Sequence, residues 1–198
     1  MSSDPSSPPL PAEDNPLPTG FYRSDYRNKL PRSNLLGRWL WSIVYRLLFY
    51  PSPVACFAWR RILLRLFGAE VDGTAKVYPS ARVWAPWNLR MGKGSAIGPE
   101  AYCYNVAAIS LDVDATVSFR AFLCAASHDI HHPDRPLITG PIHLGRGAYV
   151  FADAFIGMNV TIHEGGVVAA RAVVVKDVPA FAIVAGNPSR VVGSRQQK

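Results

Sequence analysis

Residues 144–179 read LGRGAYVFADAFIGMNVTIHEGGVVAARAVVVKDVP, and an apolar residue returns at every sixth position of this stretch. The apolar positions are Leu144, Val150, Ile156, Ile162, Val168 and Val174. The residue four places after each of them is Ala, Gly or Val. A chain that turns a corner every six residues forms a triangular coil, with the larger apolar side chain inside and the smaller residue at the crowded corner. Each such coil buries its apolar face only against its neighbours, so the stretch predicts a stack of coils, a parallel β-helix.

The same period extends back to Val71, with two extra residues after the first and second coils. We expect five coils of 18 residues, at 71–88, 91–108, 111–128, 144–161 and 162–179. All fifteen sixth-position residues are apolar, although only 49% of the chain is hydrophobic. An antiparallel sandwich would need period-two alternation and hairpin turns, yet the Asp72-Gly73 pair lies inside the six-residue period. The sequence therefore predicts an all-β solenoid, interrupted only at residues 129–143, which are expected to project as a loop.

The part of the chain before the repeats has a different composition. Residues 1–34 are expected to form a disordered, proline-rich leader and a basic arm. Residues 35–68 predict two amphipathic helices, at about 35–50 and 54–67, separated by Pro51 and Pro53 and ended by Gly68. Residues 69–198 form the predicted β-helix domain, with the insertion 129–143 and a C-terminal tail 180–198.

The net charge of +7 raises nucleic acid, an anionic membrane and acidic substrates as partners. The surplus lies in residues 21–67, which hold nine basic residues against Asp25, whereas residues 68–198 carry only +2. The basic residues of this segment alternate with Trp, Leu and Phe and form no nucleic-acid motif, so we expect no nucleic-acid partner. Residues 35–67 are expected either to touch a membrane surface or only to cap the open end of the β-helix.

Three cysteines are too few and too scattered for a disulfide scaffold. The chain has no run of 18 uncharged apolar residues that would span a membrane, and its first 30 residues lack the basic start and apolar run of a secretory signal. We therefore expect a cytoplasmic protein, with any membrane contact peripheral and at the inner face.

Beyond the repeats, the chain resembles a known family, the left-handed β-helix acyltransferases. The segments RILLRLFGAEV (61–71), APWNLRMG (85–92), LCAASHD (123–129) and VAGNPSRVV (184–192) resemble the exopolysaccharide, or colanic-acid-type, biosynthesis acetyltransferases. The S-H-x-x-H-H stretch at 127–132 and the A-G-x-P-x-R ending at 185–190 are similar to the galactoside and maltose O-acetyltransferases. The resemblance implies a left-handed helix, a homotrimer, and transfer of acetyl from acetyl-CoA to a sugar hydroxyl of a glycan or lipid-linked precursor.

His128 is the residue to which the resemblance assigns the chemistry. A neutral imidazole can take the proton of an acceptor hydroxyl as its oxygen attacks the thioester carbonyl. Asp129 would orient the imidazole or touch the acceptor, although a solvated acid fits the sequence equally well. Asn105 is expected to bind acceptor hydroxyls, with a turn-forming asparagine as the alternative.

The resemblance places the coenzyme along the last coils. Lys176 and Arg190 would meet its phosphates, because guanidinium and ammonium groups bind phosphate oxygens well. By the same resemblance, Ala152, Ala170 and Val175 would line the pantetheine arm, and Tyr149 would pack on the coenzyme or the acceptor. No metal is expected.

Two other functions remain open on the sequence. A metalloenzyme of the γ-type carbonic anhydrase kind shares the prism, but it needs three histidines that converge on one metal ion. Here His128, His131 and His132 are crowded at the start of one loop. A non-catalytic scaffold is the second alternative, and the presence of His128, Lys176 and Arg190 argues against it.

Overall fold

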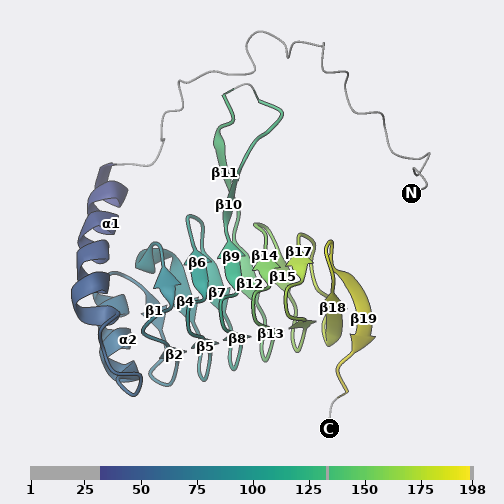
Figure 1. The fold of residues 1–198 in the computed structure, drawn as a ribbon, viewed down its shortest axis with the longest axis horizontal. Helices are drawn as coiled ribbons and strands as arrows, with labels where there is room; N and C mark the ends of the chain where they lie inside the picture. The colour runs from purple at the N-terminus through teal and green to yellow at the C-terminus, as the bar shows by residue number, and fades with distance from the viewer. Residues whose placement is uncertain (1–31, 133, 197–198) are drawn as a thin grey trace, which may run out of the picture.

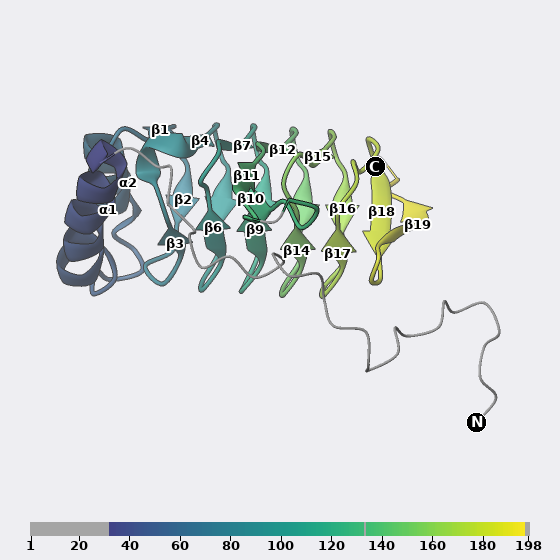
Figure 2. The same cartoon turned by 90° about the horizontal axis from the view of Figure 1, so that it is seen from above.

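A computed structural model describes residues 32–132 and 134–196 (Figure 1). The predicted leader and nearly all of the basic arm lie outside the described residues. The described part is a long prism of stacked coils with two helices at one end and an antiparallel strand at the other (Figures 1 and 2). No helix within it is long and apolar enough to cross a lipid bilayer.

The helical end follows the predicted pattern closely. Helix α1 spans Arg32–Val44 and continues into a π-helical turn at Tyr45–Phe49, and helix α2 spans Phe57–Leu66. The chain leaves α2 at Gly68, whose φ of +86° lies in the left-handed region that glycine adopts without strain.

Three parallel sheets form the sides of the prism, as the period of six predicts. Sheet A contains β1 (Glu70–Val71), β4 (Leu89–Met91), β7 (Ile109–Leu111), β12 (Ile142–Leu144) and β15 (Thr161–Ile162). Sheet B contains β2 (Lys76–Val77), β5 (Ala96–Ile97), β8 (Thr116–Val117), β13 (Tyr149–Val150), β16 (Val167–Val168), β18 (Ala182–Ala185) and the antiparallel β19 (Arg190–Ser194). Sheet C contains β3 (Arg82–Val83), β6 (Tyr102–Tyr104), β9 (Phe122–Cys124), β14 (Phe155–Ile156) and β17 (Val173–Val174). This is the architecture of the left-handed parallel β-helix that the resemblance implied.

The stack is longer than the five coils expected from the sequence. Val178 bridges in parallel to Ile162, and β18 pairs with β16, so the chain begins a sixth turn. Part of the predicted tail 180–198 therefore belongs to the prism. Strand β19 then folds back antiparallel on β18.

The core confirms the predicted apolar residue at every sixth position of the repeats. All fifteen sixth-position residues are buried, at most 6% exposed. Twelve of the fifteen residues four places further on are also buried; the exceptions are Trp87, Ala107 and Ser127, where the chain passes from sheet C to sheet A. At these three corners the fully buried residues are Ala85, Asn105 and Ala125.

The first coil has no coil before it, and side chains of the helical segment occupy its open edge. Four carbonyl groups on this edge each accept a side-chain N–H: Val71 from Arg65 (2.8 Å), Ala75 from Arg61 (3.0 Å), Val77 from Arg60 (2.6 Å) and Val83 from Trp41 (2.7 Å). We name Arg60, Arg61, Arg65 and Trp41 the edge donors. The expected role of residues 35–67 as a cap on the β-helix is thus present in the structure.

The edge donors stand where a preceding coil would stand. In the second coil, the equivalent carbonyls accept main-chain N–H groups of the first coil, in the pairs Met91 from Asp72, Ser95 from Lys76, Ile97 from Tyr78 and Cys103 from Trp84. Arg60 is fully buried and also donates to the hydroxyl of Ser52 and the carbonyls of Pro53 and Val54. Burial lowers the pKa of the Arg60 guanidinium from its usual value. Three of the nine basic residues counted in residues 21–67 therefore bond to main-chain carbonyls of the first coil.

Candidate active site

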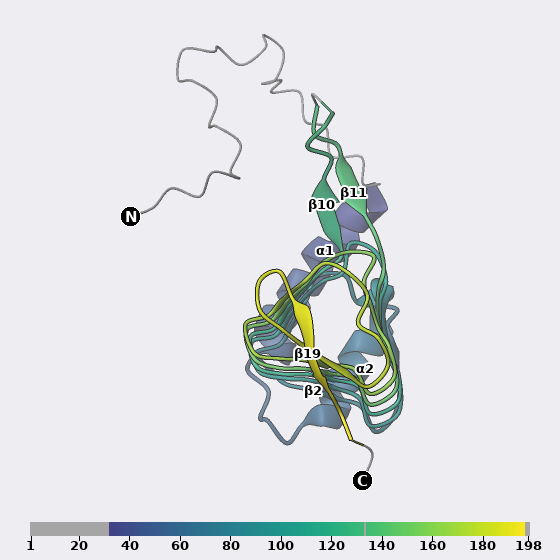
Figure 3. The same cartoon turned by 90° about the vertical axis from the view of Figure 1, so that its right-hand side faces the viewer.

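A two-stranded hairpin carries the predicted base. Strands β10 (Ala126–His128) and β11 (Leu137–Thr139) pair antiparallel, with His128 opposite Leu137. The hairpin leaves the prism at the corner between sheets C and A and projects away from it (Figure 3). The excursion begins before residue 129, so His128 lies on the hairpin rather than at the end of the third coil.

A main-chain carbonyl just before β11 determines the tautomer of His128. Its Nδ1 lies 2.8 Å from the carbonyl oxygen of Arg135. A carbonyl oxygen can only accept, so in the neutral ring Nδ1 carries the proton and Nε2 carries the lone pair. The side chain is exposed to solvent. The arrangement therefore presents an oriented imidazole with a basic Nε2.

Asp129 shapes the loop that follows. Its Oδ1 accepts the N–H of His131 at 3.0 Å, and its own N–H donates to the carbonyl of Pro136 at 3.0 Å. Farther along the loop, Nδ1 of His132 accepts the N–H of Asp134 at 3.1 Å. These bonds hold the end of the hairpin in a compact turn beside His128.

Asn105 is placed differently from the expectation of a substrate contact. It is fully buried at the corner between sheets C and A of the second coil. Its Oδ1 accepts the N–H of Ala85 at 2.9 Å, and its Nδ2 donates to the carbonyl of Ala85 at 2.6 Å. The side chain thus joins the first two coils, which is the turn-forming alternative that the sequence left open, and it has no surface on which an acceptor could lie.

Two of the expected coenzyme residues line one apolar cavity. Tyr149 and Ala170 border a cavity of about 610 Å³ on the outer face of sheet B. Phe151, Ile183 and Arg195 border it as well, and Arg195 donates from Nη1 to the carbonyl of Gly147 at 3.0 Å. Sequence reasoning did not select Arg195. Its only signal was a basic residue in the short polar tail.

The other expected coenzyme residues lie at two different corners of the prism. Ala152 stands one coil before Ala170 at the corner between sheets B and C, where its carbonyl accepts the N–H of Arg171. Val175 and Lys176 are exposed and follow β17 at the corner between sheets C and A, the corner from which the hairpin leaves. Arg190 is exposed at the start of β19 and pairs with Ala185. Within one chain, the residues at the corner between sheets B and C therefore do not meet those at the corner between sheets C and A.

A polar cluster on sheet A was also missed by the sequence reasoning. Nδ1 of His143 lies 2.8 Å from the hydroxyl of Ser110, and its Nε2 lies 3.3 Å from Oδ2 of Asp112. Ser110 and His143 each precede a buried leucine of the repeat, so they face outward in register. No group of three or more His, Cys, Asp or Glu residues within 32–132 and 134–196 is arranged to hold a metal ion.

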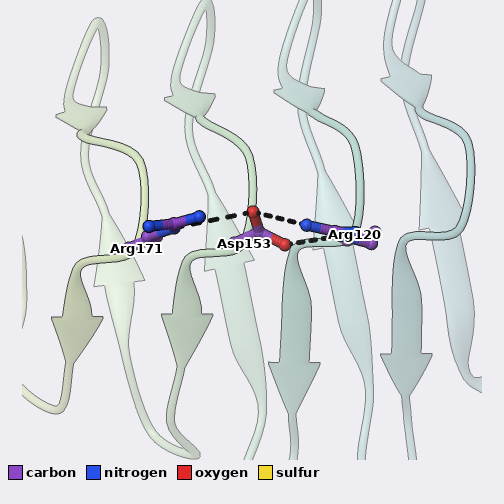
Figure 4. Close-up of polar contacts among 3 residues, drawn as sticks. All are labelled: Arg120, Asp153 and Arg171. Atoms are coloured by element: carbon purple, nitrogen blue, oxygen red, sulfur yellow. Dashed lines mark hydrogen bonds and ion pairs between the residues drawn. The ribbon is translucent and has the colours of Figure 1, made fainter.

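A column of alternating charge joins the coils beside the cavity (Figure 4). Arg120 binds Asp153 through two hydrogen bonds of 2.7 and 3.0 Å, and Arg171 lies 3.9 Å from the same carboxylate. The hydrogen bond from Arg120 holds the pKa of Asp153 below its usual value. All three residues have a positive φ at the corner between sheets B and C, so their side chains stack along the prism.

The chain was compared with family models and with the sequences of known proteins. No family model matches the chain. A protein of Escherichia coli strain K12 named "putative colanic acid biosynthesis acetyltransferase" is 33% identical over 156 residues, which cover 79% of this chain and 86% of the relative.

Solved structures share the fold at lower identity. A maltose O-acetyltransferase from Clostridium difficile superposes with a TM-score of 0.76 at 20% identity, covering 84% of this chain and 90% of the neighbour. A hexapeptide-repeat acetyltransferase from Vibrio cholerae, solved with acetyl coenzyme A, has a TM-score of 0.72 at 24% identity and covers 82% of this chain and 89% of the neighbour.

Proposed function

The chain belongs to the family of the colanic acid biosynthesis acetyltransferases, and on that premise we propose that it transfers acetyl from acetyl-CoA to a saccharide hydroxyl, with His128 as the general base. The observation that carries this proposal is the hydrogen bond from Nδ1 of His128 to the Arg135 carbonyl. It leaves the lone pair on Nε2, where a base needs it.

The chemical step is a direct transfer. Nε2 of His128 takes the proton of the acceptor hydroxyl while the hydroxyl oxygen attacks the carbonyl carbon of the thioester. A C–O bond forms, the C–S bond breaks, and the proton on Nε2 passes to the departing thiolate sulfur. Asp129 contributes by holding the loop that borders the base, and its half-buried carboxylate lies next to the site where the acceptor would bind.

The residues available for acetyl-CoA suit its two chemical parts. The apolar cavity bordered by Tyr149 and Ala170, with Ala152 one coil away, offers a slot for the pantetheine arm. Lys176, beside Val175, and Arg190 are exposed cations that would meet the phosphates. The Vibrio cholerae neighbour was solved with acetyl coenzyme A, which supports this co-substrate for the fold.

The separation of these residues supports assembly from several copies. His128 and Lys176 lie along the corner between sheets C and A, whereas Tyr149, Ala152 and Ala170 lie at or beside the corner between sheets B and C. A site that uses both sets would be formed between neighbouring chains. The proposed enzyme is a homotrimer with three such sites.

The acceptor is proposed to be a glycan or a lipid-linked saccharide precursor. The name of the Escherichia coli relative includes the biosynthesis of colanic acid. The exposed position of His128 on a projecting hairpin also suits an acceptor larger than a monosaccharide.

The test is release of free thiol from acetyl-CoA in the presence of a panel of glycan acceptors. We expect His128→Ala to lower turnover by about two orders of magnitude or more, because general base catalysis typically contributes that much. His143→Ala, which changes a partly exposed histidine on sheet A, is the matched control and should retain turnover. Unchanged turnover in His128→Ala would remove this residue from the proposed role.

A further inference from the structure

A groove between α1 and sheet C has a lining unlike that of the proposed acetyl-transfer site. It has a volume of about 650 Å³. Its walls include Arg38, Arg46 and Arg82 together with the rings of Tyr45, Trp84 and Tyr102. We name it the arginine groove. Its lining residues belong to α1, the turn that follows it and the first two coils. Figure 1 shows these elements at the helical end of the prism.

The three guanidinium groups of the arginine groove are not neutralised by the described part of the chain. None of them forms an ion pair with a carboxylate of residues 32–132 or 134–196, and no acidic residue borders the groove there. Arg38 lies instead over the ring of Trp84, 4.2 Å from its centroid, and donates to the amide oxygen of Asn34 at 2.9 Å. A groove with three such donors attracts an anion, and guanidinium groups bind phosphate oxygens in pairs.

One side of α1 and the turn that follows it is apolar and exposed. Leu36, Trp39, Leu40, Ile43 and Leu47 are between 38 and 68% exposed. At 100° per residue these positions fall on one side of the helix, away from the buried Trp41 and Phe49. Arg46 follows Ile43 by three residues, so the arginine groove and this apolar stripe adjoin along the helix.

From this combination we infer that the arginine groove binds the phosphate group of an anionic membrane lipid while the apolar stripe of α1 contacts the acyl layer. A free phosphorylated metabolite would use the groove and leave the stripe without a function. A lipid phosphate uses both, because a helix with an apolar side next to cations lies at the headgroup boundary of a bilayer. The three arginines among the edge donors do not line this groove, since they bond to carbonyls of the first coil.

The position of the arginine groove also suits a lipid that carries a saccharide, a step that rests on the proposed function. The groove borders Trp84 in the first coil, and the hairpin with His128 leaves the third coil. At about 4.8 Å per coil the two sites are about 10 Å apart along the prism. Tyr104, whose ring lies 5.4 Å from that of Trp84, and Cys124 stand between them on sheet C.

The test is flotation of the full chain with vesicles, without acetyl-CoA or acceptor. The vesicles contain phosphatidylcholine alone, or phosphatidylcholine with about 30% phosphatidic acid. We expect binding only to the second kind, and competition by excess inorganic pyrophosphate. Arg46→Ala and Arg82→Ala should each weaken binding about fivefold, because one cation near an anionic surface contributes roughly that factor. Arg146→Ala removes an exposed positive charge at the fourth coil and should bind as the wild type does.

The apolar stripe is tested with matched substitutions. Leu47→Gln should weaken vesicle binding about tenfold, since it removes a side chain that enters the acyl layer. Val192→Gln, at a similarly exposed position on β19, should not. The inference is overturned if wild type does not bind the vesicles, if it binds pyrophosphate but no vesicle, or if Leu47→Gln changes the oligomeric state and not the binding. Because flotation needs no turnover, its failure and a failure of acetyl transfer are read separately.

Discussion

The two ends of the prism are closed by different means. At the N-terminal end, the edge donors of the helical segment bond to four carbonyls of the first coil, and Arg60 is fully buried there. At the C-terminal end, β19 pairs with β18, and every residue of β19 is exposed. The first closure is made by side chains inside a packed cap, whereas the second is made by main chain at the surface.

This difference means that the stability of the helical end depends on particular side chains, whereas that of the C-terminal end does not. A main-chain strand can pair with an edge whatever its side chains are, because each residue supplies its own N–H and C=O. A side-chain cap requires a donor of the right length at each position. We therefore expect single substitutions to act strongly at the helical end and weakly at the C-terminal end.

The largest effect is expected for Arg60→Ala. The substitution leaves the buried carbonyl of Val77 without its donor and removes the part-buried bonds to the carbonyls of Pro53 and Val54. Each such loss costs about 1–3 kcal/mol, so we expect the free energy of unfolding to fall by about 3–5 kcal/mol. Thermal and urea unfolding measure it, with the exposed Arg90→Ala as control. Equal losses in the two variants would contradict the side-chain cap.

An intermediate effect is expected when β19 is removed by ending the chain after Gly186. The strand is exposed throughout, and β18 keeps its parallel partner β16 and its buried Val184. We expect a loss of about 1–2 kcal/mol in urea unfolding, no larger than the effect of a typical destabilising point substitution. A chain that ends after Ser194 keeps β19 and serves as control. A loss larger than that of Arg60→Ala would reverse the comparison of the two ends.

The smallest effect is expected for Asp153→Asn. Asp153 lies between the two ends of the prism, and the substitution removes the only carboxylate drawn between Arg120 and Arg171 in Figure 4. The pKa of Asp153 is lowered in the folded protein, so its contribution is present above the ordinary pKa of a carboxyl group. That contribution is lost as the pH falls through the lowered value. Unfolding midpoints of wild type and variant should therefore differ slightly at pH 7 and converge at low pH and in high salt. A difference that grows at low pH would contradict this sign.

The sequence predicted the regular part of the fold because one physical requirement repeats there. Each inward residue must be apolar and each ordinary corner must be small, so both columns can be found by counting. The count fails at the corners between sheets C and A of the first three coils. The two extra residues after each of the first two coils add inward-facing Leu89 and Ile109, and the insertion 129–143 follows the third coil. At all three corners the buried position lies two residues earlier than the counted one, at Ala85, Asn105 and Ala125.

The candidate site was predictable in its residue types and less so in its geometry. His128 was identified by its motif, but its place on a hairpin and its bond to the Arg135 carbonyl depend on pairing between strands that have no repeat. The role of Asn105 stayed open in the sequence because a polar residue in an apolar stretch looks the same whether it binds a substrate or a backbone. The edge donors could not be found by counting either, because a basic residue on a helix does not reveal which carbonyl it reaches.

The edge donors also bear on the length of the molecule. A stack of identical coils has no internal reason to begin at one place, since every coil presents the same row of carbonyls to the coil before it. An unoccupied first row would accept the last coil of another molecule, and filaments would grow end to end. By filling that row with three guanidinium groups and an indole, the helical segment acts as a terminator that gives each chain a finite size.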